Sequence, residues 1–253
     1  MTVRYSDLKD KRVFITGGGT GIGASIVEHF CEQKAEVYFI DINDKASNEL
    51  VLKCKNKKIS IPNFIKCDLL NIKKLQSVLS QIIDANGPIE ILINSAANDE
   101  RHNIEDVTEE YWNDRMNINL RHYFFTVQSV REAMIKNNGG VIVNIGSASW
   151  MIGQGGMAAY TAAKSGVVGL TRSFARDLGK YNIRVNSVVP GWTITERQLE
   201  KWLTSESEAD MMKKQCIKRR LMPSDIAKAV LFFSSDQSSG CTNQSYVVDN
   251  GWL

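Results

Sequence analysis

Tyr160 and Lys164 are the residues whose types and spacing most directly indicate chemistry. They stand four apart in the stretch YTAAKSG, which begins a predicted helix over residues 160–180. Residues at i and i+4 share one helix face, with Cβ atoms about 5–6 Å apart, so the lysine can place its charge near the phenol. Ionising a phenol near neutral pH requires about 3–4 kcal/mol, and an ammonium about 4–5 Å away at an effective dielectric of about 20 supplies about as much. The spacing therefore predicts a catalytic tyrosine that the lysine makes acidic.

A glycine-rich turn near the start of the chain predicts a dinucleotide site. The stretch VFITGGGTGIG places Gly17, Gly21 and Gly23 between a predicted strand and a predicted helix. Glycines allow a sharp turn and a close approach of the backbone to a pyrophosphate, whose charge suits the free N–H groups of a helix start. An acid, Asp41, ends the second predicted strand, as the dinucleotide fingerprint requires.

Asp41 indicates NAD rather than NADP as the cofactor. Its carboxylate can accept hydrogen bonds from the ribose hydroxyls, whereas a 2′-phosphate there would meet a like charge, a repulsion of about 4 kcal/mol before screening. Thr20 adds no cation that would attract the phosphate. An alternative remains open, in which Asp41 only caps a helix over residues 43–54.

The elements that must position these residues alternate between strands and helices. Short β-branched and aromatic runs alternate with segments of helical spacing, a pattern typical of βαβ units and a parallel sheet covered on both faces. The predicted strands cover 12–16, 36–41, 63–68, 89–94, 141–146, 183–189 and 245–249, and predicted helices include 21–33, 72–85, 112–136 and 160–180. No linker or repeat interrupts residues 1–253, so we expect one α/β domain, a doubly wound seven-stranded Rossmann fold. The polar segment 192–220, without a strand pattern, is a candidate mobile cover over the substrate.

Composition excludes several other classes of protein. The 253 residues carry 31 Lys and Arg against 28 Asp and Glu, a net charge of +3, too small to indicate a nucleic-acid or anionic-membrane partner. The five cysteines are scattered and never spaced as CxxC, and the three histidines share no ligand spacing, so we expect neither disulfides nor a metal. The charged start and the lack of a membrane-length apolar run predict a cytoplasmic protein.

Eight ordered motifs give a specific resemblance. TGGGTGIG, CDL, NSAAN, NINL, NIGS, YTAAK, PGWTIT and a terminal VDNG follow one another as in the short-chain dehydrogenase/reductase family, over essentially the full chain. The resemblance implies a catalytic tetrad of Asn119, Ser147, Tyr160 and Lys164. Tyr160 would be the base in oxidation and the acid in reduction, Ser147 would bond the reacting oxygen, and Asn119 would hold a water that links the lysine to solvent.

The resemblance also implies a set of cofactor contacts and an assembly. Asp68 would meet the adenine, Asn94 would line the cofactor groove and Thr195 would approach the carboxamide, although turn or cap chemistry is the alternative for Asn94 and Thr195. The full expected cofactor set is Gly17, Thr20, Gly21, Ile22, Gly23, Asp41, Asp68, Leu69, Asn94, Tyr160, Lys164, Pro190, Gly191 and Thr195. Ala97 departs from the family's Asn-Asn-Ala-Gly, and its methyl could crowd the cofactor. A homotetramer is also implied, through the helices over 112–136 and 160–180 and the last strand.

The segments that should form the substrate pocket are polar and contain tryptophans, which favours a sugar. Ligands sit beyond the carboxyl ends of parallel strands, where the chain reads NDERH, SWMIGQGGM and WTITERQLEKW. A polyol needs hydrogen-bond partners and an aromatic platform, whereas an acyl chain needs an apolar wall. The candidate substrate residues are Asn98, Arg101, Ser147, Trp150, Gln154, Tyr160, Trp192 and Arg197.

Four stretches resemble the bacterial aldose 1-dehydrogenase branch, which includes xylose dehydrogenases: NDERH, INLRHYFF, GSASW and TERQLEKW. The resemblance implies oxidation of an aldose at C1 to a lactone. Two alternatives stay open. One is a carbonyl or 3-oxoacyl reductase of the same family, and the other is a regulator that senses NAD(H) without chemistry. The second is disfavoured because both Tyr160 and Lys164 are present.

Overall fold

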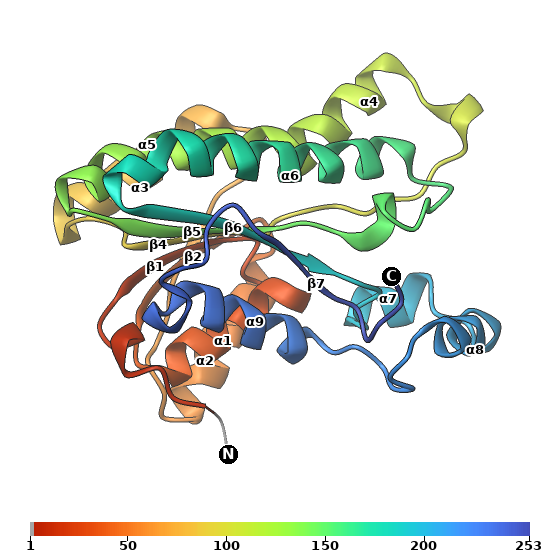
Figure 1. Cartoon of the computed structure of the whole chain (residues 1–253), viewed down its shortest axis with the longest axis horizontal. Coiled ribbons are helices and arrows are strands. Elements are labelled where there is room, and N and C mark those ends of the chain that lie inside the picture. Colours follow the sequence, from red (N-terminus) through yellow and green to blue (C-terminus); the bar gives the residue numbers. More distant parts are fainter. Residues whose placement is uncertain (1–2) are drawn as a thin grey trace.

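The computed structural model describes residues 3–253 and has three layers, with a parallel sheet between two layers of helices (Figure 1). The sheet has seven strands in the order β3-β2-β1-β4-β5-β6-β7, and every neighbouring pair is parallel. The strands are β1 (Arg12–Thr16), β2 (Glu36–Asp41), β3 (Asn63–Lys66), β4 (Ile91–Asn94), β5 (Gly140–Ile145), β6 (Ile183–Pro190) and β7 (Ser245–Val248). All seven predicted strands and the Rossmann fold are confirmed.

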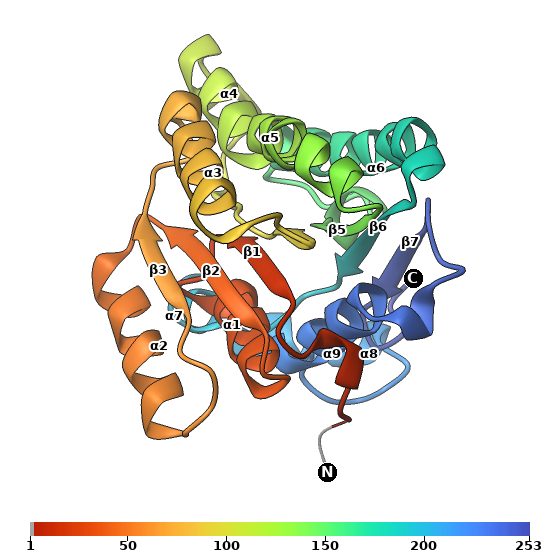
Figure 2. The ribbon, with the colours of Figure 1, turned by 90° about the vertical axis from the view of Figure 1, so that its left-hand side faces the viewer.

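The helices divide between the two faces of the sheet. In Figure 1, α3, α4, α5 and α6 lie above the sheet and α1, α2 and α9 lie below it, and Figure 2 shows the same layers end on. The longer helices are α1 (Gly21–Glu32), α2 (Asp44–Asn56), α3 (Ile72–Asn86), α4 (Glu109–Met116), α5 (His122–Lys136), α6 (Ala158–Leu178), α7 (Glu196–Lys201), α8 (Ser205–Lys214) and α9 (Pro223–Ser234). Short 3-10 turns occupy Ser6–Leu8, Ile104–Asp106, Ala148–Trp150, Gly179–Tyr181 and Asp236–Ser238.

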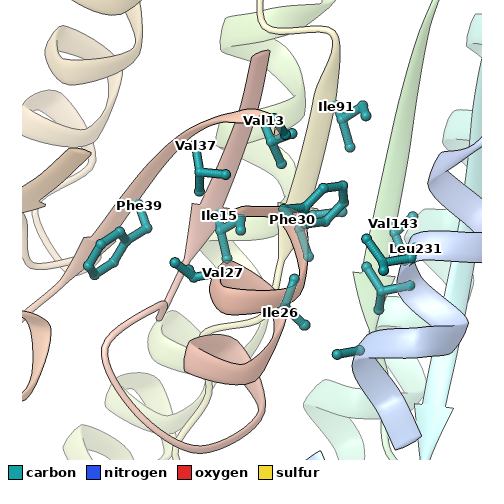
Figure 3. Close-up of a cluster of buried hydrophobic side chains, with 14 of the residues drawn as sticks. Val13, Ile15, Ile26, Val27, Phe30, Val37, Phe39, Ile91, Val143 and Leu231 are labelled. Atoms are coloured by element: carbon teal, nitrogen blue, oxygen red, sulfur yellow. The ribbon is translucent and has the colours of Figure 1, made fainter. Parts of the chain in front are cut away.

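Alternation along β1 shows how the sheet builds two cores. Val13 and Ile15 point to the α1 and α9 side, where they join Phe30 and Leu231 (Figure 3). Phe14 points the other way and joins the core under α3, α5 and α6. All three β1 side chains are fully buried, as expected for a central parallel strand covered on both faces. Each such burial contributes roughly 1.5–3 kcal/mol, so the sheet is a rigid base for the loops at its carboxyl edge.

Two segments differ from the prediction. The expected single helix over 112–136 is a helical run from Glu109 to Lys136 with a π-helical turn, Asn117–Arg121, inside it. The polar segment 192–220 contains two helices that were not predicted, α7 and α8, each begun by a threonine cap, Thr195 and Thr204. Short helices with few buried residues leave little apolar periodicity to detect. No helix within residues 3–253 is long and apolar enough to cross a bilayer.

Candidate active site

The glycine turn after β1 is packed so tightly that only glycine fits. A Cβ on Gly23 would lie 1.9 Å from the Gly17 carbonyl oxygen, and one on Gly17 would lie 2.6 Å from the Ala96 Cα. Gly17 and Gly21 also have left-handed φ values of 68° and 55°. The turn therefore packs α1 against β1 and lies against the segment after β4, as a phosphate-binding loop must.

The start of α1 leaves backbone donors free for an anion. Its cap residue, Thr20, makes no side-chain cap hydrogen bond, so the first-turn N–H groups, including that of Ile22, have no side-chain partner there. The helix has no acidic residue in its first turn, and its dipole favours negative charge at this end. These features fit a pyrophosphate.

Asp41 stands at the tip of the glycine turn. One carboxylate oxygen accepts from the Gly19 N–H at 2.9 Å, and the other accepts from the Asn43 N–H at 2.9 Å. The side chain of Asn43, not that of Asp41, caps α2 by accepting from the Ala46 N–H. The alternative in which Asp41 only caps that helix is therefore wrong.

Asp68 and Asn94 lie on either side of the expected groove, in different surroundings. Asp68 is exposed after β3, beside half-buried Leu69, and accepts from the Leu70 N–H. Asn94 is fully buried, and its amide bonds Asn144 at 2.9 Å and Thr126 at 2.7 Å. The Asn94 side chain therefore belongs to a buried hydrogen-bond network, and the expectation that Asn94 lines the cofactor groove stays a prediction.

The segment after β6 meets the glycine turn from the other side. The strand ends at Pro190, and a Cβ on Gly191 would lie 2.5 Å from the Asp249 Cβ. Thr195 caps α7 by accepting from the Gln198 N–H, and its methyl group would lie 3.2 Å from a Cβ on Gly21. Thr195 thus has the cap role that was its alternative, and it also borders the glycine turn.

Ser147 and Tyr160 come together from β5 and α6. Ser147 follows the end of β5 and bonds Ser149, while Tyr160 lies in the first turn of α6. Burial raises the pKa of Tyr160 well above its ordinary value, and the Asp99 carboxylate raises it further. A hydrogen bond with Ser147 lowers it, but by less. Without cofactor, the phenol is therefore a weaker acid than free tyrosine.

Lys164 does not correct this, and the expectation that its spacing alone makes the phenol acidic is wrong. Its amine donates to the Tyr123 hydroxyl at 2.9 Å and to the Ile145 carbonyl at 2.8 Å, and lies 5.7 Å from the centre of the Tyr160 ring. Burial also lowers the pKa of Lys164 to about 7, although Asp99 opposes that shift. The amine is thus partly neutral at pH 7, and neither of these hydrogen bonds goes to Tyr160.

Asn119 lies in the π-helical turn and is fully buried. Its side-chain oxygen accepts from the Asn98 N–H at 2.8 Å, and its amide donates to the carbonyls of Asn98 and Arg115. The side chain therefore fixes the loop after β4. The water that it would help to hold stays a prediction.

A polar cluster joins the loop after β4 to α7. Asp99 accepts from Arg197 at 3.0 Å and from Gln198 at 2.7 Å, and Arg197 also donates to the Asn98 side chain at 3.1 Å. Trp192 donates to the Gln198 side chain at 2.8 Å. Because Asp99 also acts on the pKa values of Tyr160 and Lys164, this cluster faces the catalytic pair.

The other predicted substrate residues lie apart from this polar cluster. The Arg101 guanidinium stacks 4.4 Å above the ring of Trp202, which lies in the polar segment 192–220. Trp150 and Gln154 are exposed after β5, where Gln154 donates to the Gly155 carbonyl. Ala97 is also exposed and does not have a left-handed φ, so its methyl group causes no strain in the chain itself.

Two residues with a place in this site were given no role in the sequence analysis: Asp99 and Tyr123. Asp99 stands in NDERH, a predicted pocket segment, so its position was signalled but its pairing with Gln198 on α7 was not. Tyr123 stands in INLRHYFF, but no role was predicted for it. Only the packing of α5 against α6 places its hydroxyl on Lys164.

The family follows from this geometry together with the comparisons. Residues 17–253 match the family model described as "Enoyl-(Acyl carrier protein) reductase". With that match, the parallel sheet and the glycine turn, the chain belongs to the short-chain dehydrogenase/reductase family and is an oxidoreductase that acts on CH–OH groups. Enzymes of this family use a nicotinamide cofactor.

Two sugar dehydrogenases are among the relatives that are similar in sequence. The chain is 45% identical over 248 residues to the D-xylose 1-dehydrogenase of Caulobacter vibrioides, with 98% of each chain covered. It is 42% identical to a protein of Rhizobium meliloti named "Probable galactose dehydrogenase", with 98% of this chain and 97% of the relative covered. A solved 3-oxoacyl-[acyl-carrier protein] reductase of Brucella melitensis has the same fold, with a TM-score of 0.90, 26% identity, and 99% and 94% of the chains covered.

Proposed function

We propose that the protein is an NAD-dependent sugar dehydrogenase that oxidises an aldose at C1 to the lactone. The observation that carries the proposal is the polar cluster of Asp99, Arg197, Gln198 and Trp192 facing the catalytic pair. Paired donors and acceptors beside an indole suit a polyol, whereas a long acyl chain needs an apolar wall. The two sugar dehydrogenase relatives support the same substrate class.

NAD is the cofactor that Asp41 favours. The Gly19 and Asn43 N–H groups already hold its carboxylate at the edge of the glycine turn, where ribose hydroxyls can donate to it. The residues that would hold the cofactor are the glycine turn, Ile22, Asp68, Gly191 and Thr195, and when bound the nicotinamide supplies the hydride acceptor.

In the proposed reaction, the C1–H bond of the sugar breaks, and its hydrogen and electron pair leave as hydride. Tyr160 takes the proton of the C1 hydroxyl, and Ser147 bonds the same oxygen as it becomes a carbonyl. Lys164 must then be positive, because an ammonium favours the ionised phenol. The lactone leaves together with the reduced cofactor.

The decisive experiment measures turnover with both cofactors and both substrate classes. Purified protein is incubated with NAD or NADP and a panel of pentoses and hexoses, and with NADH or NADPH and an acetoacetyl thioester, while absorbance at the nicotinamide band is followed. We expect aldose oxidation with NAD and slow or no thioester reduction. Thioester reduction without aldose oxidation would assign the chain to the reductase alternative.

The assembly and location of the protein are further parts of the proposal. Half-exposed apolar rings lie on the helices expected at one subunit contact, Trp112 and Phe124, and near the last strand, Phe232 and Tyr246. Such rings favour a homotetramer of the kind that the family resemblance implies. All five cysteines are free, which supports a reducing cytoplasm. Light scattering of the purified protein measures the mass of the assembly.

A further inference from the structure

Lys164 lies between two phenols, and only one of them belongs to the catalytic motif. Its amine donates to the hydroxyl of Tyr123, from α5, at 2.9 Å and to the Ile145 carbonyl at 2.8 Å. The Tyr123 hydroxyl donates in turn to the same carbonyl at 2.9 Å. Tyr123 is fully buried, so these three groups form a closed triangle out of reach of solvent.

The triangle leaves one donor of Lys164 for the reaction. An ammonium has three N–H donors, and Tyr123 and Ile145 take two of them. Tyr160 lies on the same face of α6, one turn before Lys164, with its ring centre 5.7 Å from the amine. The bonds to Tyr123 and Ile145 therefore hold the amine near Tyr160 and leave one of its three donors unused.

Apart from Tyr123 and Ile145, few groups near Lys164 stabilise its protonated form. The groups that face it are Tyr160 on α6, Tyr123 and His122 on α5, and Asp99 from the loop after β4. Burial lowers the pKa of His122 to about 3, so that ring is neutral, and the positive charges of Lys164 and, to a lesser extent, Arg121 lower it further. Asp99 is shared with Arg197 and Gln198. Two neutral acceptors, the Tyr123 hydroxyl and the Ile145 carbonyl, are the direct hydrogen-bond partners of the ammonium.

The π-helical turn helps to explain how one helical run contacts both the loop after β4 and Lys164. Asn119 lies in this turn, and Tyr123 follows it by four residues at the start of α5. A π turn inserts one residue and so shifts the following side chains by about 100° around the helix axis. Asn119 thereby bonds the Asn98 backbone while Tyr123 reaches Lys164.

We propose that Tyr123 is a positioning residue that keeps Lys164 protonated and directs its free N–H toward Tyr160. This inference rests on the proposed function, in which a charged Lys164 favours ionisation of Tyr160. Tyr123 itself touches neither substrate nor cofactor in this proposal. Its effect should therefore appear in the pH dependence of the reaction rather than in binding.

The test is Tyr123→Phe, which removes the acceptor and keeps the ring. Without that acceptor, the protonated form of Lys164 is less stable. The pKa of Tyr160 therefore rises, and Tyr160 ionises only at higher pH. We expect the rising limb of kcat/KM for aldose oxidation to move up by about one pH unit and kcat at pH 7 to fall about tenfold. The loss should shrink at high pH, while KM for the sugar and Kd for NADH stay within about twofold. A loss equal at every pH, or an unchanged profile, would overturn the proposal.

Two further measurements separate this proposal from other causes. The control is Tyr38→Phe, which removes a phenol hydroxyl that bonds Glu36 on β2, far from the site, and should leave the profile unchanged. In the wild-type protein, the Lys164 ammonium should give nuclear Overhauser contacts to the Tyr123 ring at pH 6, and their absence would contradict the geometry. This measurement needs no turnover, so it still tests Tyr123 if no aldose is oxidised and the proposed function fails.

Discussion

A buried amine and a half-buried phenol define what the site can do at the scale of single residues. Burial disfavours both charged forms, so the pKa of Lys164 is lowered to about 7 and that of Tyr160 is raised. The catalytic state needs the opposite arrangement, a positive lysine beside an ionised tyrosine. The positive charge of an oxidised nicotinamide would favour the phenolate, so catalysis in this pocket depends on charge brought by the ligand as well as on Lys164.

Removing the Tyr160 hydroxyl tests this assignment. In Tyr160→Phe, no group remains at that position to take the C1 hydroxyl proton, and we expect kcat to fall at least about a thousandfold. The Kd for NADH, measured by fluorescence, should change by less than about threefold, because the ring remains. Retained turnover would remove Tyr160 from the mechanism, and lost NADH binding would show that the substitution disturbed the fold.

Asp41 should decide between the two nicotinamide cofactors. In Asp41→Asn the negative charge is lost, and even a quarter of the roughly 4 kcal/mol repulsion against a 2′-phosphate corresponds to about fivefold. We therefore expect the ratio of kcat/KM for NADP to that for NAD to rise at least about fivefold. Asp44→Asn is the matched control, since Asp44 is an exposed carboxylate on α2 paired with Lys66. An equal rise in that variant would point to general surface charge.

At the scale of elements, close packing fixes the positions of the loops at the carboxyl edge of the sheet. The first glycine turn touches Ala96 after β4 and lies beside Thr195 before α7, so three segments far apart in sequence share one small volume. Gly23 is the tightest point of that packing. The site is therefore sensitive to a single methyl group at a position that contributes no chemical group.

Gly23→Ala should show this sensitivity. Its Cβ would lie 1.9 Å from the Gly17 carbonyl oxygen, so the turn must move. We expect a loss of about 1–3 kcal/mol in the free energy of unfolding and at least a tenfold weaker NADH affinity. The control is Gly179→Ala, at the end of α6, where a Cβ meets nothing within 4 Å and φ is −57°. That variant should be unchanged or more stable by about 0.4–1 kcal/mol, and equal losses in both variants would contradict the packing argument.

The number of residues that an element buries explains which elements could be predicted from the sequence. The strands and the helices α1, α3, α5 and α6 were predicted because burial imposes a period of 2 or 3.6 on the side chains. Helix α9 was not among the predicted helices, although it also has a buried apolar face. The helices α7 and α8 and the π turn were not, since the first two bury few residues and the third depends on how Asn119 and Tyr123 meet their partners. Motif residues such as Tyr160 and Lys164 were found, but their hydrogen bonds and pKa shifts were not, because these depend on tertiary burial.

For the whole molecule, the buried bases link folding stability to pH. Unfolded Lys164 holds its proton up to about pH 10.5, whereas the folded protein releases it near pH 7. Between these values the unfolded chain binds more protons, so the stability of the cofactor-free protein rises with pH. His122, with a folded pKa of about 3 against 6.5, gives a rise in the same direction between pH 3 and 6.5. Tyr160 acts oppositely above about pH 10, and the thiols of Cys31 and Cys67 do so near pH 9, because their pKa values are raised in the folded protein and the unfolded groups ionise first.

We therefore expect the free energy of unfolding, measured with urea, to increase between pH 7 and pH 8, below the range in which the thiols ionise, by at most about 1.4 kcal/mol. Lys164→Met removes the titrating amine and should flatten this range while keeping the rise below pH 6.5 that His122 causes. A flat wild-type profile would mean that the Lys164 amine keeps an ordinary pKa. In that case Tyr123 and Ile145 would support the ammonium more strongly than burial opposes it, and the lysine would be fully charged before any cofactor binds.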